Sequence, residues 1–320
     1  MNLSKTKILI TGGAGNIGSA LAEKLISNPN NFVVIMDNLS TGVLSKLPSS
    51  DKTNWKFIKG DVNYLNDVSS VMLSFHFDYV FHFAAVVGVI RTQENPIDVL
   101  NDIEGIKNIL NLSKNTSVKH VYFSSSSEVY GEPVELPQNE HRTPLNSRVP
   151  YAVVKNVGEC FFRSYWQSFH LPYTIFRFFN TYGPNQSTDF VVARFLSAAL
   201  KNKDITIYGD GMQTRTFTYV DDTVNVCTKI FEEKLLTNDV INIGNDKLMT
   251  IKDLAELTIK IANSSSKIIY LAPLKEGDMT RRQPDNTKMR EILNKKLVSI
   301  DEGIKLMMHD ERFLKAIGLK

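Results

Sequence analysis

The segment TGGAGNIG at residues 11–18 decides the predicted fold of this chain. It follows a short apolar stretch with strand character and precedes a segment, near residues 16–27, whose apolar residues recur with helical periodicity. Its glycines, Gly12, Gly15 and Gly18, have the spacing G-x-x-G-x-x-G. Such a loop lets the backbone approach a pyrophosphate closely, and the N–H groups of the following helix can bind its charge. The segment therefore predicts a dinucleotide-binding loop.

Outward from this loop, short apolar runs alternate with longer segments of helical periodicity. The runs predicted as strands are 7–10, 32–36, 55–58, 79–83, 118–123 and 173–178. The helices between them are predicted near 16–27, 64–74, 98–114 and 150–168. Nearly continuous apolar strands separated by helices are typical of a parallel sheet that is covered on both faces. The pattern predicts an α/β fold with a doubly wound, Rossmann-type parallel sheet.

The alternation weakens beyond about residue 180. One further strand is predicted at 240–243, and amphipathic helices are predicted near 250–262 and 285–293. We therefore predict a dinucleotide-binding domain over residues 1–180 and a smaller α/β substrate-binding domain over residues 181–320, with the chain free to cross between the two.

Composition narrows the class of protein. With 42% hydrophobic and 22% charged residues, the 320-residue chain has the balance of a globular protein. A net charge of +3 is too small to indicate a nucleic-acid or membrane surface. Two cysteines allow neither a disulfide framework nor a cysteine-based zinc site, and no metal is predicted. Without a signal-peptide pattern or an apolar run of membrane-spanning length, we expect a cytoplasmic protein.

An acidic residue indicates which dinucleotide is bound. Asp37 ends the second predicted strand, nineteen residues after Gly18, where its carboxylate can bind the adenosine ribose 2′-hydroxyl. It would repel a 2′-phosphate, and no basic residue follows before Lys46, so the pattern favours NAD over NADP. Asp61, after the third strand, either faces the adenine or caps the helix predicted at 64–74.

A tyrosine and a lysine form the predicted catalytic pair. Tyr151 and Lys155 are four residues apart, which places them on one face of a helix. A free tyrosine has a pKa near ~10, and we expect the lysine ammonium and a positive nicotinamide ring to lower it. The serine run 124–127 and Glu128 follow a strand of the predicted sheet, at the edge where ligands bind. If the backbone stays extended there, Ser126 and Glu128 point to the same side.

These motifs together resemble the extended short-chain dehydrogenase/reductase family of NAD-dependent nucleotide-sugar epimerases, dehydratases and decarboxylases. The chain looks like a UDP-glucose 4-epimerase with features of UDP-glucuronate decarboxylases. The similarity extends from the glycine loop to about residue 290. The matching segments are TGGAGNIGS, DNLSTG, HFAAVVGV, SSSSEVYG, YAVVK, RFFNTYGPNQ, GDGMQTRTFTYVDD and RRQPDNTK.

The resemblance implies roles for individual residues. Tyr151 would remove the proton of the sugar C4 hydroxyl while hydride passes from C4 to NAD. Lys155 would lower the tyrosine pKa and bind the nicotinamide ribose. Ser126 would bind the C4 oxygen. Asn180 would contact the nucleotide diphosphate-sugar, and Arg215 and Arg282 would bind its diphosphate, a role that the bidentate geometry of arginine suits. The cofactor-binding residues would be Gly12, Gly15, Asn16, Ile17, Gly18, Asp37, Asn38, Asp61, Val62, Ala84, Ala85, Tyr151 and Lys155.

The chain departs from the family pattern at three positions. Asp102 stands where relatives usually carry asparagine, which puts a water-relay role there in doubt. Thr216 replaces the aspartate that epimerases often have, and a small residue is more like decarboxylases. Ser127, before Glu128, replaces the aspartate of the Asp-Glu pair in the thymidine-diphosphoglucose dehydratases.

We expect a 4-epimerase of a UDP-hexose or UDP-hexuronate, because reversible oxidation at C4 needs only Tyr151, Lys155 and Ser126. The alternative enzyme is a nucleotide-sugar dehydratase or UDP-glucuronate decarboxylase in which Glu128 acts as acid/base or orients the sugar. A non-catalytic dinucleotide-binding sensor is the alternative from another class. By analogy with the family we also expect a homodimer built on the helices near 98–114 and 150–168. The apolar residues divided between that interface and the core would include Ile106, Ile109, Leu110, Phe161 and Phe162.

Overall fold

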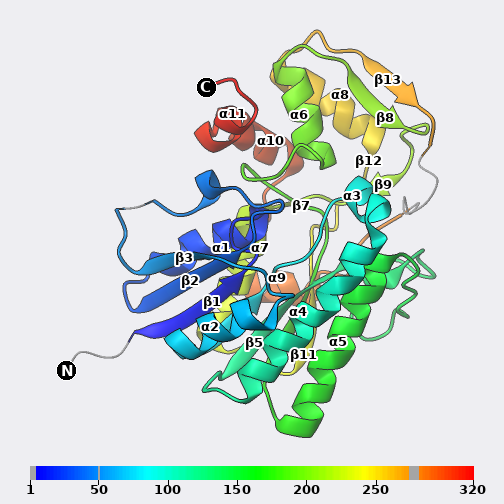
Figure 1. Cartoon of the computed structure of the whole chain (residues 1–320). Helices are drawn as coiled ribbons and strands as arrows, with labels where there is room; N and C mark the ends of the chain where they lie inside the picture. Colours follow the sequence, from blue (N-terminus) through cyan, green and yellow to red (C-terminus); the bar gives the residue numbers. More distant parts are fainter. Residues whose placement is uncertain (1–4, 50, 274–280) are drawn as a thin grey trace.

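A seven-stranded parallel sheet organises the chain, as the sequence predicts (Figure 1). The computed structural model describes residues 5–49, 51–273 and 281–320. The strand order across the sheet is β11-β6-β5-β4-β1-β2-β3. The strands are β1 (Thr6–Thr11), β2 (Asn31–Asp37), β3 (Trp55–Lys59), β4 (Tyr79–His82), β5 (His120–Ser126), β6 (Tyr173–Phe178) and β11 (Asp239–Ile243).

Helices cover both faces of this sheet, and the alternation of strand side chains explains how. Leu9 and Val34 point into one apolar core, whereas their neighbours Ile8 and Val33 point into the other. The first core is closed by α2 (Leu65–Phe75), α4 (Pro96–Lys114) and α5 (Pro150–Phe169). The second is closed by α1 (Asn16–Ile26), α7 (Val220–Glu233) and α9 (Thr287–Leu293).

The later part of the chain forms a smaller lobe with a core of its own. Figure 1 shows this lobe above the sheet. Its helices are α6 (Val191–Leu200), α8 (Ile251–Ala262), α10 (Ile300–His309) and α11 (Glu311–Ala316). Its short strand pairs are β8 (Ile205–Tyr208) with β13 (Ile268–Leu271), and β9 (Thr214–Arg215) with β12 (Met249–Thr250). A further pair, β7 (Thr181–Tyr182) with β10 (Thr218–Tyr219), lies where the chain passes between sheet and lobe.

The chain does cross between the two regions. After leaving the large sheet at β6, it returns through α7, which packs on α1, and through β11, which pairs with β6. Residues 220–243 therefore belong to the sheet region, although they lie after the predicted boundary at residue 180. Short elements that the sequence did not predict include α3 (Val89–Glu94) and two 3-10 turns, η1 (Leu44–Lys46) and η2 (Ser127–Tyr130). None of the helices in the described ranges is both long and apolar enough to cross a membrane.

Candidate active site

A cavity of about 1300 Å³ lies at the carboxyl edge of the large sheet. Its walls come from the glycine loop, the ends of β2, β4 and β5, the first turns of α5, and residues of the smaller lobe near Phe190. Ligands of parallel α/β sheets bind at this edge, because the loops after the strands leave a crevice there. The cavity therefore joins the motifs that the sequence analysis singled out.

The glycine loop needs glycine at two of its positions. Gly12 has a φ of +70°, and a Cβ on it would lie 2.6 Å from the backbone nitrogen of Ala84. A Cβ on Gly18 would lie 2.4 Å from the carbonyl oxygen of Gly12. No side chain caps the N-terminus of α1, so the N–H groups of its first turn are available at the cavity wall. This cradle fits the pyrophosphate of a dinucleotide, with Gly12, Gly15, Asn16, Ile17 and Gly18 all lining it.

Asp37 lies at the cavity end predicted for the adenosine. It is buried, and its Oδ2 accepts a hydrogen bond from the Ala14 N–H at 3.0 Å while Oδ1 accepts one from the Leu39 N–H at 2.8 Å. The carboxylate is thus fixed in orientation beside the glycine loop. Lys46 also lines this part of the cavity; burial lowers the pKa of its ammonium, and the Asp37 charge opposes that effect.

Asp37→Asn should weaken NAD binding on the order of ten-fold and reduce the preference for NAD over NADP. The change removes the anion that binds the ribose and repels a 2′-phosphate, and hydrogen bonds to a charged group contribute about 1.5–3 kcal/mol. Calorimetric titration of both dinucleotides into wild type and variant measures this. Tighter binding of NADP than NAD by the wild type would show that the interpretation of this strand end is wrong.

Asp61 lines the cavity and is held by two hydrogen bonds, and its contact with the adenine stays a prediction. Its Oδ2 accepts from Asn38 Nδ2 at 2.9 Å and its Oδ1 from the Asn63 N–H at 2.9 Å. The alternative, a cap of the following helix, is wrong, because α2 begins at Leu65 with Tyr64 at the capping position. Asp61, Asn38 and Val62 all line the cavity, as do Ala84 and Ala85 after β4.

The predicted Tyr-Lys pair lies on α5, which begins with Pro150 at its first position. Both side chains face the cavity, and the Lys155 Nζ is 5.7 Å from the centre of the Tyr151 ring. Lys155 is buried and donates to Ser124 Oγ at 3.3 Å. Burial lowers the pKa of Lys155 to about 8, and the Asp102 carboxylate opposes this.

The pKa of Tyr151 differs from the expectation. Burial raises it far above its ordinary value, and the negative charge of Glu128 raises it further; the hydrogen bond with Ser126 and the charge of Arg282 act in the opposite direction. The net shift is upward in this arrangement, and Arg282 is the cation that opposes it. Desolvation penalises the phenolate more than the nearby cations favour it. A bound nicotinamide ring would bring a positive charge, and we expect that charge to lower the pKa of the phenol.

Ser126 and Glu128 come together in a different way from the predicted one. β5 extends through the serine run to Ser126, and η2 begins at once, so the backbone is not extended between the two residues. Ser126 Oγ accepts from the Glu128 N–H at 3.2 Å and caps this turn. The turn nevertheless places both residues on the cavity wall.

A buried arginine from a distant part of the chain completes this end of the cavity. The Arg282 Nη1 lies 3.6 Å from Glu128 Oε1 and donates to Ser127 Oγ at 3.4 Å. Asn180 also lines the cavity, with its Nδ2 donating to the Thr216 carbonyl. Arg215 is buried on β9, where it donates to the Thr214 carbonyl, and is not among the residues that line the cavity. The structure thus brings Arg282 and Asn180 to the other predicted site residues but does not bring Arg215.

Sequence reasoning missed a buried ion pair beneath the site. Arg177 on β6 makes two hydrogen bonds to Glu159 on α5, at 2.8 and 2.7 Å, and Glu159 also accepts from Ser125 Oγ at 2.7 Å. Both charged side chains are essentially inaccessible to solvent. The pair therefore ties the helix of Tyr151 to the strands beside it. The one available signal was an arginine inside the apolar strand YTIFRF.

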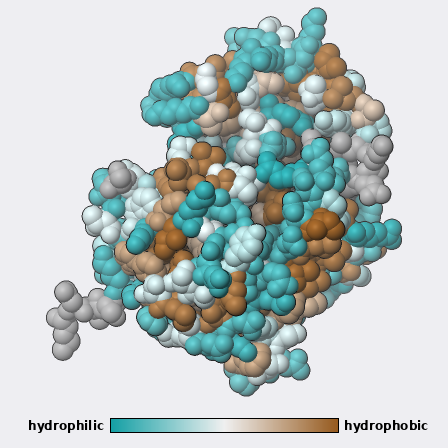
Figure 2. Space-filling view, viewed as in Figure 1, coloured by the Kyte–Doolittle hydropathy of each residue, from teal (hydrophilic) through white to brown (hydrophobic). Residues whose placement is uncertain are grey.

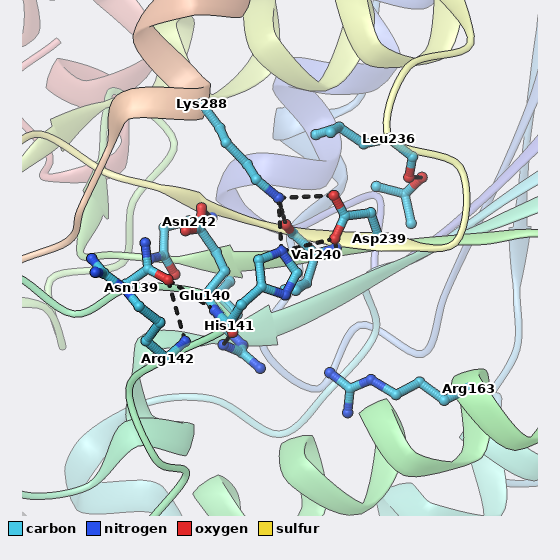
Figure 3. A network of polar contacts seen from close by, with 12 residues as sticks. Asn139, Glu140, His141, Arg142, Arg163, Leu236, Asp239, Val240, Asn242 and Lys288 are labelled. Carbon is cyan, nitrogen blue, oxygen red and sulfur yellow. Dashed lines mark hydrogen bonds and ion pairs between the residues drawn. The ribbon is translucent and has the colours of Figure 1, made fainter.

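The segment between η2 and α5 is fastened to the outer edge of the sheet. Glu140 Oε1 accepts from the Asn242 N–H of β11 at 2.8 Å. Lys288 on α9 contacts Asp239 at 2.8 Å and His141 at 3.0 Å, and Figure 3 shows these side chains converging. This anchoring lies away from the cavity and supports the segment that leads into α5, the helix of Tyr151 and Lys155.

The cavity combines a dinucleotide cradle at the edge of a doubly wound sheet with a Tyr-Lys pair and a serine. This combination defines a dehydrogenase-type enzyme that uses NAD. The chain belongs to the NAD-dependent epimerase/dehydratase family, whose model matches residues 8–244.

Relatives in this family span nearly the whole chain. A UDP-N-acetyl-alpha-D-glucosaminuronate decarboxylase of Bacillus cytotoxicus is 36% identical and aligns over 94% of this chain and 96% of its own. UDP-glucuronic acid decarboxylase 5 of Arabidopsis thaliana is 34% identical over 97% of this chain and 90% of its own. The solved UDP-glucose 4-epimerase of Thermotoga maritima with UDP-glucose has a TM-score of 0.89 at 32% identity, over 98% of this chain and 100% of that one. All three of these relatives are named for activity on UDP-linked sugars.

Proposed function

We propose that this enzyme decarboxylates a UDP-linked hexuronic acid after transient oxidation of the sugar at C4. The observation that carries the proposal is the buried Arg282 guanidinium beside Ser127 and Glu128. A guanidinium binds a carboxylate through two parallel hydrogen bonds, and we assign Arg282 to the C5 carboxyl group of a uronic acid in place of the diphosphate that the resemblance implies. Relatives named as UDP-sugar decarboxylases, at 36% and 34% identity, support the same conclusion.

The residues of the cavity suit each step of this reaction. Tyr151 removes the proton of the C4 hydroxyl, and Ser126 holds the oxygen. NAD held by the glycine loop and Asp37 would supply a reversible acceptor for the C4 hydride. The resulting C4 ketone makes the substrate a β-keto acid, so the bond from C5 to the carboxyl carbon breaks and its electron pair moves toward O4. The Tyr151 phenol and Ser126 hydroxyl stabilise this enolate by hydrogen bonds. Carbon dioxide leaves as this bond breaks, a proton from solvent then adds to C5 of the enolate, and a 4-ketopentose remains for reduction.

The function is tested by incubation with UDP-glucuronate, UDP-N-acetylglucosaminuronate and the corresponding neutral UDP-hexoses in deuterium oxide. We expect the uronates to lose the mass of carbon dioxide and the pentose product to carry deuterium at C5. Mass spectrometry and NMR of the products measure both. Unchanged uronates together with C4-inverted neutral hexoses would contradict the proposal.

Arg282→Gln should lower kcat/KM for a UDP-uronate about 100-fold, since it removes a charge-assisted contact of roughly 1.5–3 kcal/mol. The neighbouring Arg281→Gln is a matched control, because Arg281 is exposed. Steady-state kinetics of both variants distinguish a contact at position 282 from a general loss of positive charge. Equal effects at the two positions would contradict the role of Arg282.

Epimerisation at C4, which the sequence analysis puts first, is the second candidate. The similarity to the solved 4-epimerase of Thermotoga maritima favours it. Glu128→Gln separates the candidates. In this variant an epimerase should keep most of its rate and incorporate no deuterium at C5. A decarboxylase should slow to an intermediate degree. A dehydratase should slow by two decades or more, in the range of general acid/base losses of ~10²–10⁴-fold.

We also propose a homodimer formed through α4 and α5. The two helices pack against each other and expose apolar side chains, and Figure 2 shows apolar residues at the surface over α4. The exposed ones are Ile97, Leu100, Trp166 and Phe169. Of the residues predicted for this face, only Phe161 is partly exposed. Ile106, Ile109, Leu110 and Phe162 lie in the core of the chain. Light scattering at micromolar concentration should give twice the chain mass, and a monomer would contradict the proposal.

The cytoplasmic location stays a prediction.

A further inference from the structure

The serine run 124–127 contacts four different side chains at the catalytic end of the cavity. In sequence order the partners are Lys155, Glu159, Tyr151 and Arg282. The last three serines belong to the buried ion pair, the C4 oxygen site and the turn at Glu128, whereas Ser124 has no role in the reaction as proposed.

The end of the neighbouring strand places Ser124 at the cavity. β4 ends at His82, which pairs with Phe123, so Ser124 is the first residue of β5 that no longer pairs with β4. It is 8% exposed and lines the cavity. Lys155 lines the cavity from α5, and its Nζ donates to Ser124 Oγ at 3.3 Å. The serine and the lysine therefore meet where the sheet opens.

The spacing of the serines matches that of the Tyr-Lys pair. Two residues of a strand span about 6.6 Å, and four residues of a helix span about 6 Å. α5 connects β5 to the parallel strand β6, so it runs in the opposite direction to both. Ser126 therefore lies at the level of Tyr151, and Ser124 lies at the level of Lys155. Each member of the pair meets a hydroxyl of the same strand.

The Lys155 ammonium has few partners. The residue is 3% exposed, and in the part of the chain that the structure describes its only hydrogen-bond acceptor is Ser124 Oγ. The ring centres of Phe123 and Tyr151 lie 5.1 and 5.7 Å from its Nζ. An ammonium has three N–H donors on a flexible stem, so an acceptor on a rigid strand restricts where the other two point. These two donors are left for a ligand in the cavity.

We propose that Ser124 is a positioning residue of the catalytic site, which holds the Lys155 ammonium so that its remaining donors meet the nicotinamide ribose of bound NAD. The hydroxyl acts only through the lysine and touches neither the sugar nor the transferred hydride. The inference rests on the C4 oxidation step of the proposed function, which decarboxylation and epimerisation share, so it does not depend on the choice between them.

A direct titration of Lys155 tests the contact in NAD-loaded protein, with lysines labelled with ¹³C at Cε and the signal assigned through Lys155→Met. Ser124→Ala removes an acceptor that favours the charged form, so the midpoint should fall by about one pH unit. Ser124→Thr keeps the hydroxyl and should titrate close to the wild type. The titratable groups that act together with this ammonium, Asp102 on α4 and His82 on β4, are unchanged in both variants.

Calorimetry with NAD and with ADP separates a local effect from a general one. ADP lacks the nicotinamide ribose, so Ser124→Ala should bind NAD about ten-fold more weakly and ADP as tightly as the wild type does. Ser147→Ala is the matched control, because Ser147 Oγ donates to the Val129 carbonyl at 3.0 Å and Ser147 is not among the residues that line the cavity. It should bind both nucleotides normally.

Thermal unfolding of each variant checks that it folds. Equal Lys155 midpoints in wild type and Ser124→Ala would overturn the proposal, as would an equal loss of NAD and ADP affinity. A midpoint in Ser124→Thr as low as that in Ser124→Ala would also overturn it, because the hydroxyl is then not the cause. None of these measurements needs turnover, so a failure of the proposed function would be seen separately, as an absence of product from every UDP-sugar.

Discussion

Tyr151→Phe should bind NAD and the nucleotide sugar normally and lose about 10²–10⁴-fold of its turnover, the range for loss of a general base. The phenol faces the cavity beside Ser126, and the change removes only its oxygen. Because burial and Glu128 raise the pKa of this phenol, a bound nicotinamide cation has to lower it. The residual turnover should therefore stay low at all pH values.

Single-turnover formation of NADH from a saturating nucleotide sugar measures the loss, and calorimetry measures the two binding constants. Tyr165→Phe is the matched control, because Tyr165 lies on the same helix and bonds Asn111 rather than lining the cavity. It should retain the wild-type rate. A Tyr151→Phe protein with near-normal turnover would refute the assignment of the base.

Arg177→Met should lower the free energy of unfolding by about 3–5 kcal/mol, which is typical when one partner of a buried ion pair is removed. Glu159 would keep a fully buried charge and lose both of its hydrogen bonds to Arg177. The Arg177 guanidinium, first among the groups that oppose desolvation, holds the pKa of Glu159 below its ordinary value. Its contribution to stability is therefore present above the unfolded-state pKa of glutamate and is lost as the pH falls below it.

Urea unfolding at pH 7 and at pH 4 measures this difference, which should be larger at pH 7. Arg163→Met is the matched control, since Arg163 binds the same Glu159 carboxylate from a partly exposed position and should cost less than about 1 kcal/mol. Replacing Glu159 by leucine in Arg177→Met should recover much of the loss, because no buried charge then remains. Equal effects of the two arginine variants would contradict this account.

Local patterns were sufficient for the sheet, the glycine loop and the catalytic helix. An apolar strand can be predicted from side chains that are a few residues apart in the sequence. Tyr151 and Lys155 lie on one face whenever their segment is helical. The same local reasoning was wrong at the end of β5. A run of serines carries no periodicity that would show where the strand stops, and the cap that Ser126 makes on η2 bent the chain before Glu128.

The sequence by itself determined the fold class, the NAD cradle and the identity of the Tyr-Lys pair, because each depends on residues that are neighbours along the chain. Only the tertiary structure decided which distant charges meet. It placed Arg282 beside Glu128, left Arg215 outside the cavity, and paired Glu159 with Arg177. It also decided the electrostatics, because burial raises the pKa of Tyr151 and lowers the pKa of Lys155. Desolvation and Coulomb interactions depend on burial and on distance in space, and neither quantity is encoded in local spacing.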